Sequence, residues 1–120
     1  MKRILVVDDS FGVRCVTKEF FRCFFPKYVV EEAVDGLQAL EKLGVGGFDL
    51  VISDIEMPRM NGLELAKRIK QRFPQLPIIF LSGTLEKHEE EILVLEVSGY
   101  LSKPFDLKEL KLCIQRVLGD

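Results

Sequence analysis

The chain has 120 residues, of which 48% are hydrophobic and 30% are charged, a composition typical of one globular domain with a single core. Its 17 basic and 19 acidic residues give a net charge of −2. This balance argues against direct binding of nucleic acid, which usually requires a clear excess of positive charge. The apolar runs are far shorter than the roughly 20 residues that a membrane span requires.

Cysteine and histidine usage points to a reducing cytoplasm and away from zinc. Cys15, Cys23 and Cys113 form no CxxC pair, so we interpret them as free thiols rather than as disulfide partners or metal ligands. The apolar run after residue 3 is too short for a secretory signal. His88, the only histidine, stands among glutamates, and we interpret it as a solvated helix residue rather than a ligand or general base.

The first elements in chain order are a buried strand and an amphipathic helix. The run from Ile4 to Val7 is continuous rather than alternating, which predicts a strand covered on both faces. Ser10 is a residue type that caps helices, and Pro26 is expected to end the helix that Ser10 begins. The apolar face expected for this helix comprises Val13, Val16, Phe20 and Phe24.

Two further strand and helix pairs follow. Residues 28–33 form a more polar run, which predicts a strand nearer an edge of the sheet. A short helix is expected from Gly36 to Leu43, ended by the glycine-rich residues 44–47. Residues 48–53 predict a third strand, and residues 62–73 predict a helix with aliphatic residues inward and basic residues outward.

The last part of the chain predicts strands at 77–81 and 100–102, a helix at 86–97, and a final helix capped by Asp106. The helix at 86–97 contains four consecutive apolar residues, 92–95, which cannot all face inward. We therefore expect Leu93 or Val94 to be exposed, either as part of a partner or dimer surface with the last helix, or as an isolated exposed aliphatic.

Five alternations of strand and helix predict an α/β fold, a doubly wound parallel sheet with helices on both faces. Right-handed crossovers restrict its topology. In such sheets, ligands bind outside the carboxyl ends of the strands, where the winding direction reverses.

Polar side chains gather at the ends of the predicted strands. Asp8 and Asp9 follow the first strand, Asp54 the third, Ser82 the fourth and Lys103 the fifth. Each feature alone is weak, since an acidic pair after a strand is often only a helix cap. Together, at the ends of four different strands, they indicate a functional site.

The types of these residues favour phosphoryl chemistry. Three close carboxylates repel one another unless a cation neutralises them, and oxygen ligands without paired histidine or cysteine favour Mg²⁺ or Mn²⁺ over zinc. Lys103 supplies a point charge and Ser82 a hydroxyl for phosphoryl oxygens. A carboxylate such as Asp54 can itself accept a phosphoryl group.

These residues resemble the receiver domain of two-component response regulators over essentially the whole chain. The densest match is the segment from Asp54 to Gly62, DIEMPRMNG, which follows the family's D-x-x-M-P-x-M-x-G pattern. Ser82-Gly83 and Lys103-Pro104-Phe105 complete the resemblance. It implies one receiver domain over residues 1–120, with a flavodoxin-like five-stranded sheet in the order 2-1-3-4-5 and five helices.

The resemblance also implies a role for each matching residue. Asp54 would be the phosphoacceptor, and Lys103 and Ser82 would contact its phosphoryl group. Mg²⁺ would be held by Asp54, by Asp9 directly, by Asp8 through water and by the Glu56 carbonyl. Ser82 and Tyr100 would form the switch that responds to phosphorylation.

The backbone expectations are a cis bond before Pro104, a loop stiffened by Pro58 and a positive φ at Gly62. Residues 96–100 lie about one residue short of the family pattern, which predicts an altered fourth helix or helix exit. Glu56 and Thr84 are expected to flank the path of the water that hydrolyses the aspartyl phosphate.

The function implied is a signalling switch rather than an enzyme, which promotes its own phosphorylation and slow dephosphorylation. Its partners would be a sensor histidine kinase or a histidine phosphotransfer protein, and a downstream protein bound through the fourth helix, fifth strand and fifth helix. A dimer that forms on phosphorylation is a further possibility. The chain is compatible both with a free-standing receiver and with a piece of a longer regulator. Alternatives are a haloacid-dehalogenase-type phosphohydrolase, which would need Asp instead of Glu56, and a scaffold that is not phosphorylated.

Overall fold

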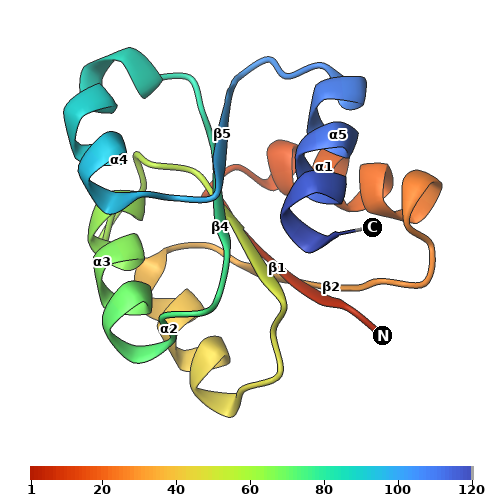
Figure 1. Cartoon of the computed structure of the whole chain (residues 1–120), viewed down its shortest axis with the longest axis horizontal. Coiled ribbons are helices and arrows are strands. Elements are labelled where there is room, and N and C mark those ends of the chain that lie inside the picture. Colours follow the sequence, from red (N-terminus) through yellow and green to blue (C-terminus); the bar gives the residue numbers. More distant parts are fainter. Residues whose placement is uncertain (120) are drawn as a thin grey trace.

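The computed structural model describes residues 1–119 and shows a five-stranded parallel sheet with helices on both faces (Figure 1). The strand order is β2-β1-β3-β4-β5, which confirms the predicted doubly wound topology. The strands are β1 (Arg3–Val7), β2 (Val29–Ala33), β3 (Leu50–Ser53), β4 (Ile78–Ser82) and β5 (Gly99–Ser102). The helices are α1 (Phe11–Phe24), α2 (Gly36–Val45), α3 (Gly62–Arg72), the 3₁₀ turn η1 (Leu85–His88), α4 (Glu89–Leu95) and α5 (Leu107–Leu118).

The two faces of the sheet support separate hydrophobic cores. Helices α1 and α5 cover one face, whereas α2, α3 and α4 cover the other (Figure 1). Alternate residues of each central strand enter opposite cores, because successive side chains point to opposite faces. Leu5 thus joins the α2–α4 side and Ile4 the α1–α5 side. This double covering explains why the central strands are continuously apolar in sequence.

The buried face of α1 differs from the predicted one. Val16 and Phe24 are 55% and 40% exposed, whereas Thr17 and Phe21 are buried beside Phe20. The Thr17 hydroxyl donates a hydrogen bond to the carbonyl of Val13 at 2.8 Å, so its polar atom is satisfied inside the core. Because its hydroxyl is hydrogen-bonded within the helix, Thr17 can occupy the inward position that the apolar pattern assigns to Val16.

The predicted helix at 86–97 is wrong at both ends. The segment begins as the 3₁₀ turn η1, and α4 ends at Leu95. Glu96 adopts a left-handed conformation with φ 53°, which terminates the helix, and the amide of Ser98 then donates to the carbonyl of Ile78. The short α4 leaves Leu93 and Val94 64% and 82% exposed, which confirms the prediction of an exposed aliphatic there.

The helix caps fix where the chain leaves the sheet. Ser10 and Asp106 cap α1 and α5 as predicted, and Asp35 and Asn61 cap α2 and α3. Each side chain accepts a backbone N–H that has no partner within its helix. Among residues 1–119, no helix has the length and apolar character needed to cross a membrane.

Candidate functional site

The candidate site lies where the winding direction of the sheet reverses, between β1 and β3. The amide of Asp54 donates to the carbonyl of Val7 at 2.9 Å, so the ends of these adjacent strands are fixed side by side. Carboxylate oxygens of Asp8, Asp9 and Asp54 all lie within 4.8 Å of one another. Asp8 is buried, Asp54 partly buried and Asp9 exposed, so the cluster opens to solvent on one side.

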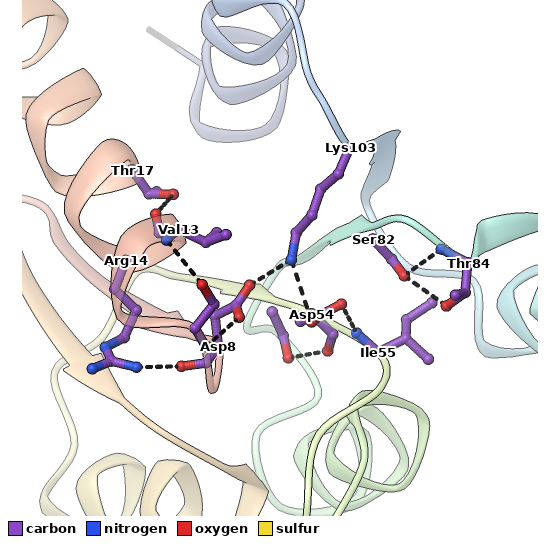
Figure 2. A network of polar contacts seen from close by, with 11 residues as sticks. Asp8, Val13, Arg14, Thr17, Asp54, Ile55, Ser82, Thr84 and Lys103 are labelled. Atoms are coloured by element: carbon purple, nitrogen blue, oxygen red, sulfur yellow. Dashed lines mark hydrogen bonds and ion pairs between the residues drawn. The ribbon is translucent and has the colours of Figure 1, made fainter.

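Lys103 reaches this cluster from the loop after β5 (Figure 2). Its ammonium nitrogen lies 2.7 Å from Oδ2 of Asp8 and 3.3 Å from Oδ2 of Asp54. The amide of Lys103 donates to the carbonyl of Ser82 at 3.0 Å, which anchors the loop to the end of β4. The bond between Lys103 and Pro104 is cis, as the sequence predicts.

Burial and charge act in opposite directions on this cluster. Removal from water raises the pKa of Asp54; Lys103 opposes this effect and Asp8 adds to it, and the pKa stays above its ordinary value. Burial would lower the pKa of Lys103, but Asp8 and Asp54 outweigh it, so that pKa is raised. The site therefore holds more negative charge than one ammonium group neutralises.

We expect Asp54→Asn to stabilise the metal-free protein at neutral pH, by about 1 kcal/mol, a common size for a single-residue effect. A carboxyl whose pKa is raised on folding favours the folded state below its unfolded pKa, and this contribution is lost as pH rises through the folded pKa. The gain from Asn should therefore shrink as pH falls below the ordinary range of Asp. Urea unfolding in EDTA at several pH values measures this trend. Equal stability of the two proteins at neutral pH would contradict the account.

Ser82 and Thr84 form a hydroxyl pair beside the cluster (Figure 2). The buried Ser82 Oγ accepts a hydrogen bond from the Thr84 amide at 3.0 Å and lies 3.0 Å from the Thr84 hydroxyl. Tyr100 is 51% exposed and lines a groove of about 220 Å³ with Leu85, Ile92 and other residues of η1, α4 and β5. The structure thus places Ser82 at the site and Tyr100 on the neighbouring outer surface.

The side chain of Glu56 contacts His88, which the sequence does not predict. Its Oε1 lies 3.3 Å from Nε2 of His88, and Nδ1 of the same ring lies 3.4 Å from Glu91. Only 19% of the His88 side chain is exposed, so His88 is less solvated than the sequence predicts.

Two arginines contact the loops around the site without a sequence signal for their roles: Arg14 contacts Asp8 itself, and Arg59 contacts the residue that caps α2. Arg14 donates to the carbonyl of Asp8 at 2.8 Å and to the carboxylate of Glu32 at 3.0 Å. Arg59 has a φ of 67° and pairs at 2.7 Å with the buried Asp35. The sequence gives no hint of the left-handed conformation of Arg59, because few residues other than glycine adopt it.

Gly62 is required by close packing and not by a positive φ, so that prediction is wrong. A Cβ atom at Gly62 would collide with the carbonyl oxygen of Asp54 and lie 2.9 Å from Cα of Ile55. The Gly62 amide also donates to the carbonyl of Ile55 at 2.6 Å. Glycine lets the start of α3 lie directly against the backbone that carries Asp54.

The donor set fits a hard divalent cation. Within residues 1–119, the cluster offers carboxylate oxygens and no histidine or cysteine ligand, which suits Mg²⁺ or Mn²⁺ better than zinc. The excess of negative charge around Lys103 gives such a cation a favourable environment. The residues that would hold it are Asp8, Asp9 and Asp54, with the carbonyl of Glu56 as the further expected ligand.

A doubly wound parallel sheet with an acidic cluster and a lysine at its switch point defines a class of α/β domains that can bind a divalent cation at the carboxyl ends of their strands. Residues 4–115 match the family model for the response regulator receiver domain. The chain therefore belongs to the response regulator receiver domain family of two-component systems.

Three relatives illustrate this membership. The transcriptional regulatory protein CrdR of Helicobacter pylori is 37% identical over 99% of this chain and 56% of its own length. The chemotaxis response regulator CheY4 of Vibrio cholerae is 35% identical, with a TM-score of 0.87 over 98% of this chain and 99% of that one. TrrA of Thermotoga maritima, solved in complex with Mg²⁺-BeF, is 36% identical, with a TM-score of 0.88 over 98% of this chain and all of that one. The chain spans about half the length of the curated response regulators it matches.

Proposed function

We propose that Asp54 accepts a phosphoryl group from a phosphohistidine partner in a Mg²⁺-dependent reaction. The observation that carries this proposal is the meeting of Asp54, its two acidic neighbours and Lys103 at one strand-end cluster. Family membership supports it, since response regulators act with sensor histidine kinases. The Mg²⁺-BeF complex of TrrA adds support from a similar domain.

In the proposed transfer, an oxygen of Asp54 attacks phosphorus as the bond from phosphorus to the histidine nitrogen breaks. The histidine leaves as the neutral imidazole after taking up a proton from solvent. Lys103 lies 3.3 Å from Asp54 and would pair with an oxygen of the arriving group. A bound Mg²⁺ would supply further neutralisation of the phosphoryl oxygens.

The phosphorylated state would differ first at Ser82. An oxygen of the new group competes with Thr84 for the Ser82 hydroxyl, which already lies within 3.0 Å of the Thr84 hydroxyl. Movement of this loop would change the groove beside Tyr100. We propose that the exposed face of α4, β5 and α5 then binds a downstream protein or a second phosphorylated copy. Exposed Leu93, Val94 and Leu112 provide apolar area for such a contact.

These roles describe a receiver domain over residues 1–120 that acts in the cytoplasm. It would carry out its own phosphorylation and slow dephosphorylation without turning over a separate substrate. The same roles would serve a free-standing receiver or one domain of a longer regulator.

The proposal is tested by incubating the protein with Mg²⁺ and acetyl phosphate and measuring its intact mass. We expect one phosphoryl adduct, which is absent without divalent cation and absent in Asp54→Asn. An adduct that persists in Asp54→Asn would overturn the assignment of the acceptor. Continuous release of phosphate at enzymatic rates without an adduct would instead favour a hydrolase, and no reaction at all would favour a scaffold.

A further inference from the structure

We propose that His88 is a positioning residue that holds the carboxylate of Glu56 and thereby lengthens the lifetime of the aspartyl phosphate. The inference rests on the proposed function of Asp54. It concerns a contact between two loops that flank the acceptor, and His88 itself is not assigned any contact with the phosphoryl group.

The His88 ring lies between two carboxylates. Nε2 is 3.3 Å from Glu56 and Nδ1 is 3.4 Å from Glu91. Glu56 and Glu91 are 53% and 54% exposed, whereas the ring is 19% exposed. A neutral imidazole can donate to one of these carboxylates, and an imidazolium can donate to both. The ring therefore has a carboxylate acceptor available in either protonation state.

The contact between His88 and Glu56 joins two loops beside the acceptor Asp54. Glu56 lies two residues beyond Asp54, in the loop after β3. His88 ends the turn η1, which begins beyond Thr84, and the amide of Lys87 donates to the Thr84 carbonyl at 3.1 Å. Thr84 in turn bonds to Ser82. His88 is thus the link between the loop that carries Glu56 and the loop that carries the hydroxyl pair.

The link bears on hydrolysis, the reaction that ends the phosphorylated state. A water oxygen forms a bond to phosphorus while the bond from phosphorus to the Asp54 oxygen breaks, and Asp54 leaves as a carboxylate. The water protons pass to the released phosphate and to solvent. Glu56 that is free to turn can accept a hydrogen bond from this water and orient it, whereas Glu56 held by His88 cannot do so as readily.

The test compares decay of the adduct in wild type, His88→Ala, Glu56→Ala and the double variant. Each protein is phosphorylated with acetyl phosphate and Mg²⁺, freed of the donor, and followed by intact mass at one fixed pH. We expect His88→Ala to shorten the half-life about threefold to tenfold, the range that one hydrogen bond produces in a rate. In the Glu56→Ala background, the same replacement should leave the half-life unchanged.

A half-life in His88→Ala that equals or exceeds that of wild type would overturn the role of His88. If His88→Ala accelerated decay of the adduct equally in the wild-type and Glu56→Ala backgrounds, the role would also be overturned. The replacement would then act by loosening the loop in general and not through Glu56. Wild-type protein that takes up no phosphoryl group would instead overturn the proposed function of Asp54. The two failures are therefore distinguishable.

The imidazole signal in the NMR spectrum gives a second readout, and it is unambiguous because His88 is the only histidine. We expect Glu56→Ala to shift this signal. Glu90→Ala is the control. It removes one acidic charge from the first turn of α4, two residues beyond His88, and Glu90 makes no ion pair or side-chain hydrogen bond in the described part of the chain. A signal that responds to Glu90→Ala and not to Glu56→Ala would overturn the proposed contact.

Discussion

Lys103→Met is expected to lower the rate of phosphoryl uptake by about 100-fold, the usual cost of removing one charged group that stabilises a transition state. Lys103 lies 2.7 Å from Asp8 and 3.3 Å from Asp54. Methionine keeps a similar length and apolar stem but supplies no charge to either carboxylate or to an arriving phosphoryl group. The rate is measured by intact mass at a limiting concentration of acetyl phosphate.

The same variant should be destabilised by about 2–3 kcal/mol in EDTA, since Asp8 loses its cation while it stays buried. Added Mg²⁺ should recover part of this stability without restoring the rate, which separates the charge balance of the folded site from the transfer step. Lys67→Met, which replaces an exposed lysine on α3, is the control and should change neither quantity. Uptake at the wild-type rate in Lys103→Met would show that Lys103 has no part in the transfer.

Gly62→Ala is expected to destabilise the protein by about 3 kcal/mol, at the upper end of the usual cost of inserting a methyl group into packed structure. The new Cβ would meet the carbonyl of Asp54 and Cα of Ile55. Both are backbone atoms, so relief requires moving the start of α3 away from the acceptor loop. Such a movement also weakens the hydrogen bond from the Gly62 amide to Ile55.

The loss is measured as a fall in the urea midpoint, and phosphoryl uptake should fall with it because Asp54 shares the displaced backbone. Gly12→Ala is the matched control. Its Cβ would come no closer than 3.9 Å to the Ser10 hydroxyl, and alanine favours the helix by up to about 1 kcal/mol. We therefore expect Gly12→Ala to match or exceed wild-type stability. If Gly62→Ala also matched wild-type stability, the close packing of α3 against the backbone of Asp54 and Ile55 would be contradicted.

The cluster at the strand ends could be predicted because the order of strands converts sequence position into spatial position. Asp8, Asp54 and Lys103 each follow a predicted strand, and parallel strands bring such ends to one edge. Residue type predicted the cap of α1 by Ser10, and helical periodicity predicted that Leu93 or Val94 is exposed. These features depend on local pattern or on topology, and both are readable along the chain.

The errors have a different origin. Thr17 is buried because its hydroxyl is satisfied within α1, a local bond that an apolar pattern does not reveal. Gly62 is needed because another segment passes close by, and a sequence alone gives no distance between segments. The helix at 86–97 is shortened by the conformation of Glu96, a residue type with no preference for a left-handed backbone.

The sequence by itself determined the doubly wound fold and the residues that meet at its switch point, since hydrophobic periodicity and strand-end residues specify both. Only the tertiary structure decided which carboxylates Lys103 contacts, where the Ser82 hydroxyl is held, and that His88 lies against Glu56. Those contacts join residues between 2 and 95 positions apart. The contacts of Lys103 and His88 depend on how side chains from different loops pack together, and no local preference in the chain encodes that packing.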